Sequence, residues 1–485
     1  MMTMTMTNLA RCLTLLGFQV FLVAIMSNSL VAETAKELVE KGIYQEETVG
    51  DLDKAIAEYQ EALKASQDSI VVAAEAQFRL AGCLEKQGKS KEAEAAYQAV
   101  IDKFGAASEW VKKAKAQLSD EIKLLPVPWG EGDEMHMAMK VVSGEVIGHQ
   151  VFRIASVTQE NRKYWECQGW QKISANGQAG YSRVLVDSKT FFPVSSEWDH
   201  TALGSAKADY SDGKVSLLNT AVSQDKKDIS LEKNHYDNEQ GAQVFRRLPL
   251  KVGMRIKSLP LVSTLGGAKV PLGLTVSKLE EIEVPAGKFE CFRIDLNVGQ
   301  TFYISNDKNR YIVRFQAGGI SADLVKVQSV TDKPSELELP SFSATLPVGW
   351  HSFESDLRKN AGEKLHRELA TQHVNIDSYL KVRPIKELSG DKTPVSWMKE
   401  VIKNVTKSTP GLTLSDSGVE AIKINGQDAA VATWTYTKKE KKFKARRWTI
   451  WGKDDVIGLQ ANIPEKDFDT WIPRFEKVAN SVKAK

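Results

Sequence analysis

The sequence predicts a multidomain α+β protein with helical hairpins at the N-terminus, a central antiparallel β domain and a C-terminal α/β sandwich. Three observations predict this order. Residues 33–124 contain no proline and are rich in Ala, Glu, Lys, Gln and Leu, which is a helical composition. Residues 134–330 consist of short alternating runs between turn signals, a pattern typical of strands. Residues 341–485 combine strand patterns with two helical stretches.

Composition supports a folded protein and excludes several functional classes. The 485 residues are 42% apolar and 26% charged, which fits a folded chain of about two to four domains. The 65 basic and 62 acidic residues leave a formal charge of +3, too balanced for a general nucleic-acid binder. Four cysteines and seven histidines are too few for a disulfide-built miniprotein or an array of zinc modules.

The first 32 residues have the pattern of a signal peptide. Arg11 precedes an apolar run of thirteen residues, Leu13 to Ile25, and cleavage after Ala32 is plausible. The run is shorter than the roughly twenty residues that span a bilayer. The alternative is an uncleaved anchor in which the apolar segment extends to Val31. We therefore expect the protein to be extracytoplasmic, in the periplasm or secreted, and membrane-tethered if the leader is retained.

A repeat follows in residues 33–124. The segments GDLDKAIAEYQEAL (50–63) and GKSKEAEAAYQAVI (88–101) align without gaps at an offset of 38 residues. Each has a turn glycine, then an alanine and a tyrosine at the same distances. This pattern resembles the tetratricopeptide repeat, a stack of helical hairpins. A plain bundle of helical hairpins is the alternative.

The resemblance to tetratricopeptide repeats implies a protein or peptide partner. Such arrays bind along the surface lined by the first helix of each pair. Carried over by position, that surface gives a candidate groove of Glu37, Tyr44, Glu47, Phe78 and Glu85. The groove would be acidic with two aromatic rings, and residues 33–124 hold 13 basic and 18 acidic groups. A basic or mixed peptide would suit it, unless these are solvated helix faces with no ligand.

The central domain is expected at residues 125–330, after a segment rich in proline and glycine. Its runs suggest about ten strands in a curved sheet or a sandwich. The segments FRRLPLKVG (245–253) and LEEIEVPAGKFECFRIDL (279–296) resemble a bacterial exported family of unknown function. In that family an Arg-x-Leu-Pro-Leu segment and a Val-Pro-Ala-Gly-x-Phe turn lie between strands of a large curved sheet. The motif residues would be structural.

Two further features of this domain leave alternatives open. Its concave face could hold a lipid or another hydrophobic ligand, or its aromatic residues could fill an ordinary core. The aromatic candidates are Tyr164, Trp165, Trp170, Phe191, Phe192 and Trp198. Cys167 and Cys291 lie in separate predicted strands, so they either form a disulfide or remain free thiols.

The last domain follows a polar linker at residues 331–340 and covers residues 341–485. Its opening LPVGW, its Asn425-Gly426 turn and its closing VANSV (478–482) resemble PsbP-like and Mog-type α/β proteins. Relatives in those families serve as extrinsic assembly or binding proteins, generally without catalysis.

A basic hairpin is predicted within the last domain. Its residues are Lys438, Lys439, Lys441, Lys442, Lys444, Arg446 and Arg447. Such a patch could contact an anionic surface, either phospholipid or the acidic helical domain of a neighbouring molecule. The alternative is a solvated hairpin tip that protects a sheet edge.

The sequence contains no G-x-S-x-G or H-E-x-x-H motif, no phosphate loop and no dinucleotide-binding glycine motif. His366 and His373 are seven residues apart, two turns of a helix, which is not metal-ligand spacing. We therefore expect no catalytic, cofactor or metal site and no nucleic-acid partner. The sequence predicts an exported, non-enzymatic scaffold or binding protein of the cell envelope. A carrier of a hydrophobic ligand is the main alternative, and a hydrolase with dispersed residues is a third.

Overall fold

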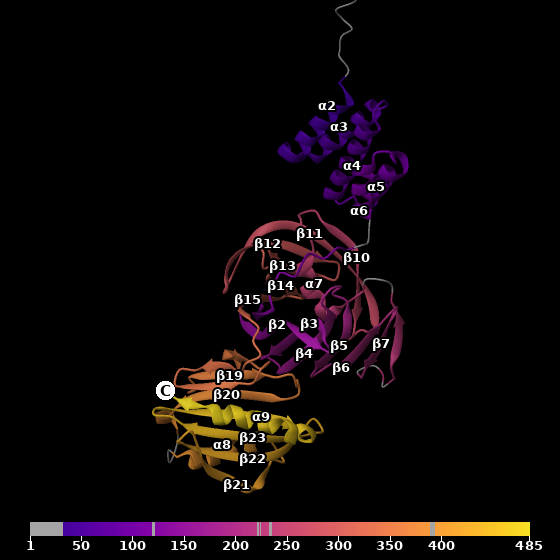
Figure 1. Cartoon of the computed structure of the whole chain (residues 1–485). Coiled ribbons are helices and arrows are strands. Elements are labelled where there is room, and N and C mark those ends of the chain that lie inside the picture. Colours follow the sequence, from indigo (N-terminus) through magenta and orange to yellow (C-terminus); the bar gives the residue numbers. More distant parts are fainter. Residues whose placement is uncertain (1–32, 119–121, 221–222, 224, 232–234, 389–392) are drawn as a thin grey trace, which may run out of the picture. The chain divides into compact units, whose positions relative to one another are not determined.

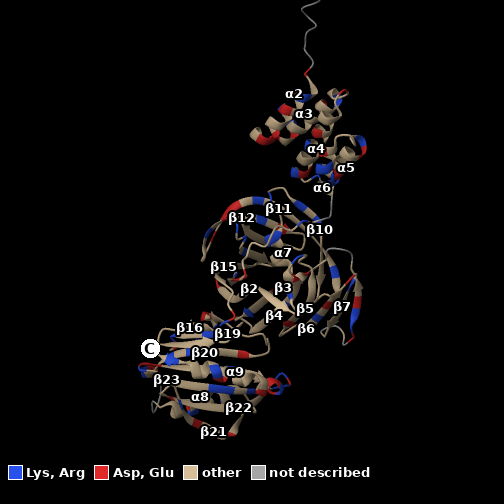
Figure 2. Cartoon of the chain, viewed as in Figure 1, with Lys and Arg blue, Asp and Glu red and all other residues tan. Residues whose placement is uncertain are grey.

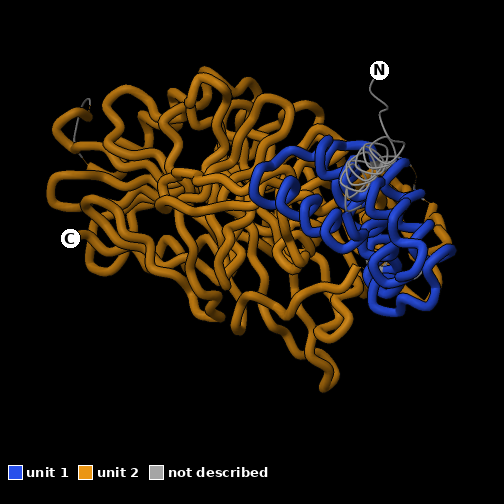
Figure 3. The backbone as a smooth tube through the Cα atoms, turned by 90° about the horizontal axis from the view of Figure 1, so that it is seen from above, with its two compact units in different colours: residues 1–120 blue, residues 121–485 orange. Residues whose placement is uncertain are grey.

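The computed structural model describes the chain except for residues 1–32, 119–121, 221–222, 224, 232–234 and 389–392. The predicted signal peptide lies outside the described residues. The chain divides into two compact units, residues 1–120 and 121–485 (Figures 1 and 3). Among the described residues, no helix is long and apolar enough to cross a membrane.

The first unit is a series of helices. They are α2 (Ala35–Ile43), the π-helix η1 (Tyr44–Val49), α3 (Leu52–Ala65), α4 (Ile70–Lys86), α5 (Ser90–Lys103) and α6 (Ser108–Leu118). Thr34 and Glu37 form a capping box at the start of α2, and Asp51 and Ser69 cap α3 and α4. Gly50 ends η1 with a φ of 77°, a conformation that favours glycine. The helices of this unit therefore begin and end at residues whose side chains or backbone conformations favour helix ends.

The repeated tyrosines connect each helical pair. Tyr59 donates a hydrogen bond to Glu46 at 2.7 Å, and Tyr97 donates one to Glu85 at 3.1 Å. The partners lie 13 and 12 residues before their tyrosines, so the first pair contains one extra residue. The π-turn of η1 accommodates it, because a π-helix has more residues per turn than an α-helix. Gly42 lies against the Tyr59 ring, where an added Cβ would approach an aromatic carbon to 2.3 Å.

The second unit begins with a large antiparallel sheet. Among the described residues it holds fifteen strands, more than the ten or so that the sequence suggested. The strands are β1 (Gly132–Val141), β2 (Val146–Gln159), β3 (Arg162–Ile173), β4 (Gln178–Asp187), β5 (Pro193–His200), β6 (Gly204–Ser211), β7 (Lys214–Asn219), β8 (Lys227–Ser230), β9 (Tyr236–Asp237), β10 (Arg255–Ser263), β11 (Ala268–Val284), β12 (Gly287–Leu296), β13 (Gln300–Ser305), β14 (Ile312–Ala317) and β15 (Ile320–Ser329). Their order is β8 to β1, then β15 to β9, so β1 pairs with β15 in the middle.

The sheet is strongly curved (Figure 1). The hydroxyl of Tyr210 on β6 donates to Asp237 on β9 at 2.6 Å, which brings the two ends of the strand order together. A short turn, η2 (Asn238–Gln240), leads into helix α7 (Gly241–Arg247), all seven residues of which are buried. Trp165 and Phe191 belong to the same buried cluster as α7. These aromatic residues are core, and the helix occupies the concave side.

Arg246, the arginine of the Arg-x-Leu-Pro-Leu segment, has a structural role. Its side chain is 0% exposed, and its two terminal nitrogens donate to the carboxylate of Asp133 at 2.9 and 2.6 Å. It also donates to the carbonyls of Asn309 and Arg310, and its guanidinium lies 4.8 Å from the Trp129 ring centre. The arginine thus ties α7 to β1 and to the loop after β13.

The C-terminal part of this unit is an α/β sandwich. Its elements are β16 (Ser335–Glu338), β17 (Phe342–Leu346), β18 (His351–Glu354), η3 (Asp356–Arg358), β19 (Leu365–Ala370), β20 (Asp377–Pro384), η4 (Ile385–Glu387), α8 (Pro394–Ser408), β21 (Thr413–Ile424), β22 (Gln427–Lys438), β23 (Lys441–Trp451), β24 (Asp455–Pro464), η5 (Glu465–Asp467), α9 (Phe468–Ser481) and β25 (Lys483–Ala484). Seven strands form one sheet in the order β18-β19-β20-β24-β23-β22-β21, and β16, β17 and β25 form a smaller one.

The two long helices cover opposite faces of the seven-stranded sheet. Along β22, Ala429 and Val431 pack in the cluster of α9, whereas Ala430 and Ala432 pack in the cluster of α8. Because successive strand residues point to opposite faces, the helices lie on different sides. The amphipathic stripe of α9, including Phe468 and Phe475, is core as its periodicity indicates.

Two local expectations for this part are wrong. The segment 331–340, predicted to be a linker, contains β16, which pairs with β17. His366 does not lie on a helix with His373, because residues 365–370 form strand β19 between β18 and β20. In both places pairing with the neighbouring strands of a sheet outweighs the local pattern.

Candidate functional site

The predicted groove residues of the helical unit fall into two groups. Tyr44 is 57% exposed, and Glu37 and Glu47 are also exposed. Phe78 instead packs between two rings, with centroids 5.3 Å from Tyr97 and 5.3 Å from Trp110. Glu85, which accepts the hydrogen bond of Tyr97, is likewise engaged in helix packing.

The exposed group lies on the first helical pair. Glu37 accepts from the backbone N–H of Thr34 at 2.8 Å, and its hydrogen bonds from the backbone and the hydroxyl of Thr34 lower the pKa of its carboxyl. Glu47 pairs with Arg79 of α4 at 3.2 Å. Tyr44 is therefore the large exposed ring of this surface, flanked along the chain by acidic groups. Figure 2 shows charged residues of both signs over these helices.

The basic hairpin presents fewer free charges than the sequence suggested. Lys438, Lys439, Lys441 and Lys442 are exposed where β22 turns into β23. Lys444 lies over the Phe468 ring, Arg446 pairs with Glu476 at 2.9 Å, and Arg447 is buried and donates to Gln460 at 3.1 Å. The last three cations are engaged within the domain, so the exposed basic patch reduces to four lysines.

Cys167 and Cys291 do not form a disulfide in the structure. Both are buried free thiols, and so is Cys83 in the helical unit. Burial raises the pKa of the Cys291 thiol to about 12 and also raises that of Cys167. Such thiols are protonated and unreactive at neutral pH.

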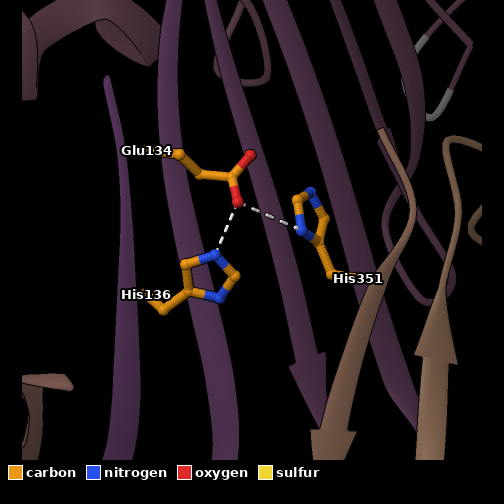
Figure 4. A group of neighbouring side chains, drawn as sticks. All are labelled: Glu134, His136 and His351. Carbon is orange, nitrogen blue, oxygen red and sulfur yellow. Dashed lines mark hydrogen bonds and ion pairs between the residues drawn. The ribbon is translucent and has the colours of Figure 1, made fainter. Parts of the chain in front are cut away.

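A cluster that the sequence analysis missed lies between β1 and β18. Glu134 and His136 are two residues apart on β1, so both side chains point to the same face of the sheet. His351 begins β18 and approaches the same carboxylate (Figure 4). The Nε2 atom of His136 lies 2.5 Å from Oε1 of Glu134, and Nδ1 of His351 lies 3.6 Å from it. The side chains of Glu134, His136 and His351 are 8%, 13% and 4% exposed.

The surroundings of this cluster hold it in place. Gln328 donates to Oε1 of Glu134 at 2.8 Å, and Nε of Arg153 lies 3.9 Å from Oε2. The His351 ring stands edge-on to Trp170, with centroids 4.4 Å apart. A cavity of about 200 Å³ adjoins the cluster and is lined in part by its three residues.

The protonation states follow from burial and charge. Burial would raise the pKa of Glu134, but the hydrogen bond from His136 and the neighbouring His351 and Arg153 hold it below its ordinary value. Burial lowers the pKa of His351 to about 4. Glu134 is therefore an anion and His351 a neutral imidazole at neutral pH. Two imidazoles and one carboxylate are a common set of metal ligands.

Only part of this cluster left a signal in the sequence. A Glu-x-His pair within a strand pattern indicates two polar groups on one face, and Glu134 and His136 fit it. His351 lies more than two hundred residues later, and nothing local relates it to β1. The histidines that the sequence did single out have other neighbours: His366 lies 3.9 Å from Glu363, and His373 lies 3.0 Å from Asp467.

Other contacts join the same two parts of the unit. His149 on β2 stacks on Phe353 of β18 with centroids 4.8 Å apart, and its Nε2 lies 2.9 Å from the carbonyl of Glu354. Lys172 on β3, 2% exposed, pairs with Asp377 on β20 at 3.5 Å. Residues of both parts, among them Trp170 and Phe353, share one buried apolar cluster.

Family models agree with two of the three resemblances seen in the sequence. Residues 47–108 match a family model described as tetratricopeptide repeat. Residues 143–324 match one described as protein of unknown function (DUF3108). Among curated proteins, none matches the chain.

Solved structures match parts of the chain at low identity. PsbP of the cyanobacterium Synechocystis sp. PCC 6803 is 15% identical with a TM-score of 0.27, covering 32% of this chain and 94% of that one. LpqN of Mycobacterium tuberculosis, described as involved in cell envelope biogenesis, is 16% identical with a TM-score of 0.23, covering 32% and 91%. A β-barrel-like DUF1849 protein of Brucella abortus is 8% identical with a TM-score of 0.27, covering 44% and 100%. The chain is therefore similar to tetratricopeptide-repeat proteins near its N-terminus and to a family of unknown function in its centre.

Proposed function

We propose that the protein is an exported, non-enzymatic scaffold of the bacterial cell envelope that binds a protein or peptide through its helical repeats. The observation that carries the proposal is the repeat itself. Residues 47–108 match the tetratricopeptide model, and two helical pairs each close on the same tyrosine-to-glutamate hydrogen bond. Tetratricopeptide arrays in general serve protein–protein interaction.

The binding surface that the contacts support is smaller than the predicted groove. Tyr44 offers a half-exposed ring, and Glu37 lies seven residues before it and Glu47 three residues after it. Aromatic rings often anchor protein interfaces because they bury a large area at low entropic cost. An acidic rim around such an anchor favours a basic or mixed peptide.

Export is supported by the apolar leader pattern in residues 1–32. The β-rich parts would act as envelope contacts, with Lys438, Lys439, Lys441 and Lys442 as the exposed cations for an anionic surface. A hydrophobic ligand within the curved sheet gains no support, because α7 fills the concave side with buried residues.

The proposal is tested by purifying the mature, untagged chain from its own host and measuring bound protein by native mass spectrometry. We expect a stoichiometric protein or peptide partner. The double variant Tyr44→Ala, Glu47→Lys should reduce its occupancy about tenfold, the loss that follows removal of an interface anchor. Val142→Ala, at an apolar side chain that is 91% exposed in the β domain, is the matched control and should leave the occupancy unchanged.

Two results would contradict the proposal. A partner that remains fully bound in the double variant would remove the Tyr44 surface from the binding site. A chain that carries a lipid and no protein would favour the carrier instead.

A further inference from the structure

We infer that Glu134, His136 and His351 bind one divalent cation of the zinc class, and that this ion clamps the β domain to the C-terminal α/β domain. The inference rests on the positions of three side chains within one compact unit. It is independent of the proposed partner binding by the helical repeats.

The ligand set selects the class of metal. The three ligand atoms are two imidazole nitrogens and one carboxylate oxygen, and they lie within 4.8 Å of one another. Zinc in proteins is held by such nitrogen and oxygen ligands, and three protein ligands leave a fourth position for water. Calcium and magnesium prefer oxygen ligands and higher coordination numbers, so a site rich in imidazole suits them poorly.

The spacing is close to what a tetrahedral ion requires. With zinc–ligand bonds of about 2.0–2.1 Å, neighbouring ligand atoms stand roughly 3.3 Å apart. His351 Nδ1 is 3.6 Å from Glu134 Oε1, near this value, whereas His136 Nε2 is closer at 2.5 Å. A side-chain movement of less than about 1 Å at His136 therefore separates the pair enough for an ion.

The arrangement also leaves a polar group that the protein does not satisfy. Three nitrogen groups converge on one carboxylate oxygen, from His136, Gln328 and His351. The Nε2 atom of His351 is buried and has no hydrogen-bond partner among the described residues. Burying a polar atom without a hydrogen bond costs free energy. No protein hydrogen bond therefore fixes the His351 ring through Nε2, which leaves Nδ1, on the side of Glu134, as its polar contact.

The neighbouring cations limit which ions can bind. Arg153 lies 3.9 Å from the free oxygen of Glu134, and Lys326 lines the same cavity. Their charge repels any cation, so weakly held hard ions are disfavoured. Zinc, which forms strong bonds to imidazole nitrogen, is the ion that such a site retains.

The ligands come from both sides of a junction. Glu134 and His136 belong to β1 of the fifteen-stranded sheet, and His351 belongs to β18 of the seven-stranded sheet. An ion bound to all three links the two sheets directly, next to the stacked pair of His149 and Phe353. Binding should therefore stabilise the junction by mass action, since an ion that binds only the docked state favours it.

The test uses the mature, untagged chain after chelator treatment. Zn²⁺ binding is measured by isothermal titration and by metal analysis after dialysis, and Co²⁺ serves as a spectroscopic probe of tetrahedral nitrogen ligation. We expect one Zn²⁺ per chain, a visible tetrahedral Co²⁺ spectrum, and a rise in the melting temperature with added Zn²⁺. The variants His136→Ala and His351→Ala should each weaken binding at least tenfold and abolish the rise in melting temperature.

His149→Ala is the matched control, because it removes an imidazole from the same junction without touching Glu134. It should keep both the stoichiometry and the Co²⁺ spectrum. The inference is overturned if the wild-type chain binds no Zn²⁺ above the chelator-treated level, or if His136→Ala and His351→Ala bind it as tightly as wild type. If a variant fails to fold by circular dichroism, the wild-type Zn²⁺ stoichiometry decides, because less than one ion per chain contradicts the site.

Discussion

Glu46 in the helical unit and Glu134 in the β unit are similar carboxylates with different kinds of partner. Each side chain is less than a tenth exposed and receives several donors. Glu46 accepts from Tyr59 and Lys86, both at 2.7 Å, which lie 13 and 40 residues away in neighbouring helices. Glu134 meets Gln328 and His351, which lie about two hundred residues away. One network joins neighbouring helices along the repeat, and the other is built only when distant strands meet.

The comparison teaches that the two units depend on contacts of different range. In the helical unit, the stabilising contacts join elements that are close in sequence, and the hydrogen bond from tyrosine to glutamate occurs in both helical pairs. In the β unit, the polar contacts that tie α7, β1 and β18 together are long-range and occur once. Substitutions in the two units should therefore differ in how much stability they cost and in which contacts they disrupt.

The largest effect is expected at Arg246. Arg246→Met leaves Asp133 buried without its cation and removes donors from two backbone carbonyls. Removing one partner of a buried pair costs about 3–5 kcal/mol. Urea unfolding followed by tryptophan fluorescence should show this loss. Arg293→Met, at a pair with Asp295 that is about one-third exposed, should cost less than about 1 kcal/mol. Equal losses of stability in the two variants would contradict the expectation that the buried pair of Arg246 contributes more than the exposed pair of Arg293.

The next effect is expected at Gly42 in the helical unit. In Gly42→Ala the added Cβ would meet the Tyr59 ring at 2.3 Å, so the first helical pair must move apart. Overpacking of this kind costs about 1–3 kcal/mol, and the gain in helix propensity offsets part of it. Thermal unfolding of the helices, followed by circular dichroism, measures the difference. Gly82→Ala, whose added Cβ lies 3.7 Å from the Tyr97 hydroxyl, is the control and should not destabilise. A neutral Gly42→Ala would show that the first pair is loosely packed.

The ion pair of Asp377 with Lys172 makes the stability of the junction between the two sheets depend on pH. Burial would raise the pKa of Asp377, but Lys172 and Arg358 lower it to about 2. A lowered pKa means that the pair stabilises the fold above pH 4 and that this stabilisation is lost as the pH falls from about 4 to 2. Asp377→Asn leaves Lys172 buried without its partner and should cost about 2 kcal/mol at pH 7, less than a fully buried pair because Asp377 is 40% exposed.

The measurement is the stability difference between wild type and Asp377→Asn at pH 7, 5 and 3. Other carboxylates titrate in both proteins, so the difference isolates this group. It should be constant from pH 7 to 5 and smaller at pH 3. A difference that grows on acidification would mean that the pKa is not lowered.

The smallest effects are expected at the two glutamates of the helical repeat. Glu46→Gln weakens contacts with Tyr59, Lys86 and Arg79 and should cost about 1.5 kcal/mol. Glu85→Gln weakens the bond from Tyr97 and should cost about 0.5 kcal/mol. Thermal unfolding of both variants, followed by circular dichroism, measures the two losses of stability. A larger loss at Glu85 would contradict the view that Glu46 is the more connected of the two.

Much of the fold was predictable because it depends on local patterns. The glycine, alanine and tyrosine spacing identified the helical pairs, and the turn at Val284 to Gly287 closes the β11–β12 hairpin as the motif suggested. The resemblance to tetratricopeptide repeats places Phe78 in the predicted groove, because the corresponding helical position lines the groove in that family. Its real neighbours, Tyr97 and Trp110, depend on how the next hairpin packs. Arg446 and Arg447 belong to the predicted basic patch, but their contacts with Glu476 and Gln460 depend on how α9 and β24 pack against β23.

The sequence by itself determined the order of the domains and the helical repeat, because composition, periodicity and turn chemistry act over a few residues. Only the tertiary structure decided that α7 fills the curved sheet, that Arg246 pairs with Asp133, and that His351 meets Glu134 and His136. The physical reason is that such contacts depend on strand pairing and curvature across about two hundred residues. No local pattern in the chain specifies which of its histidines will share a carboxylate.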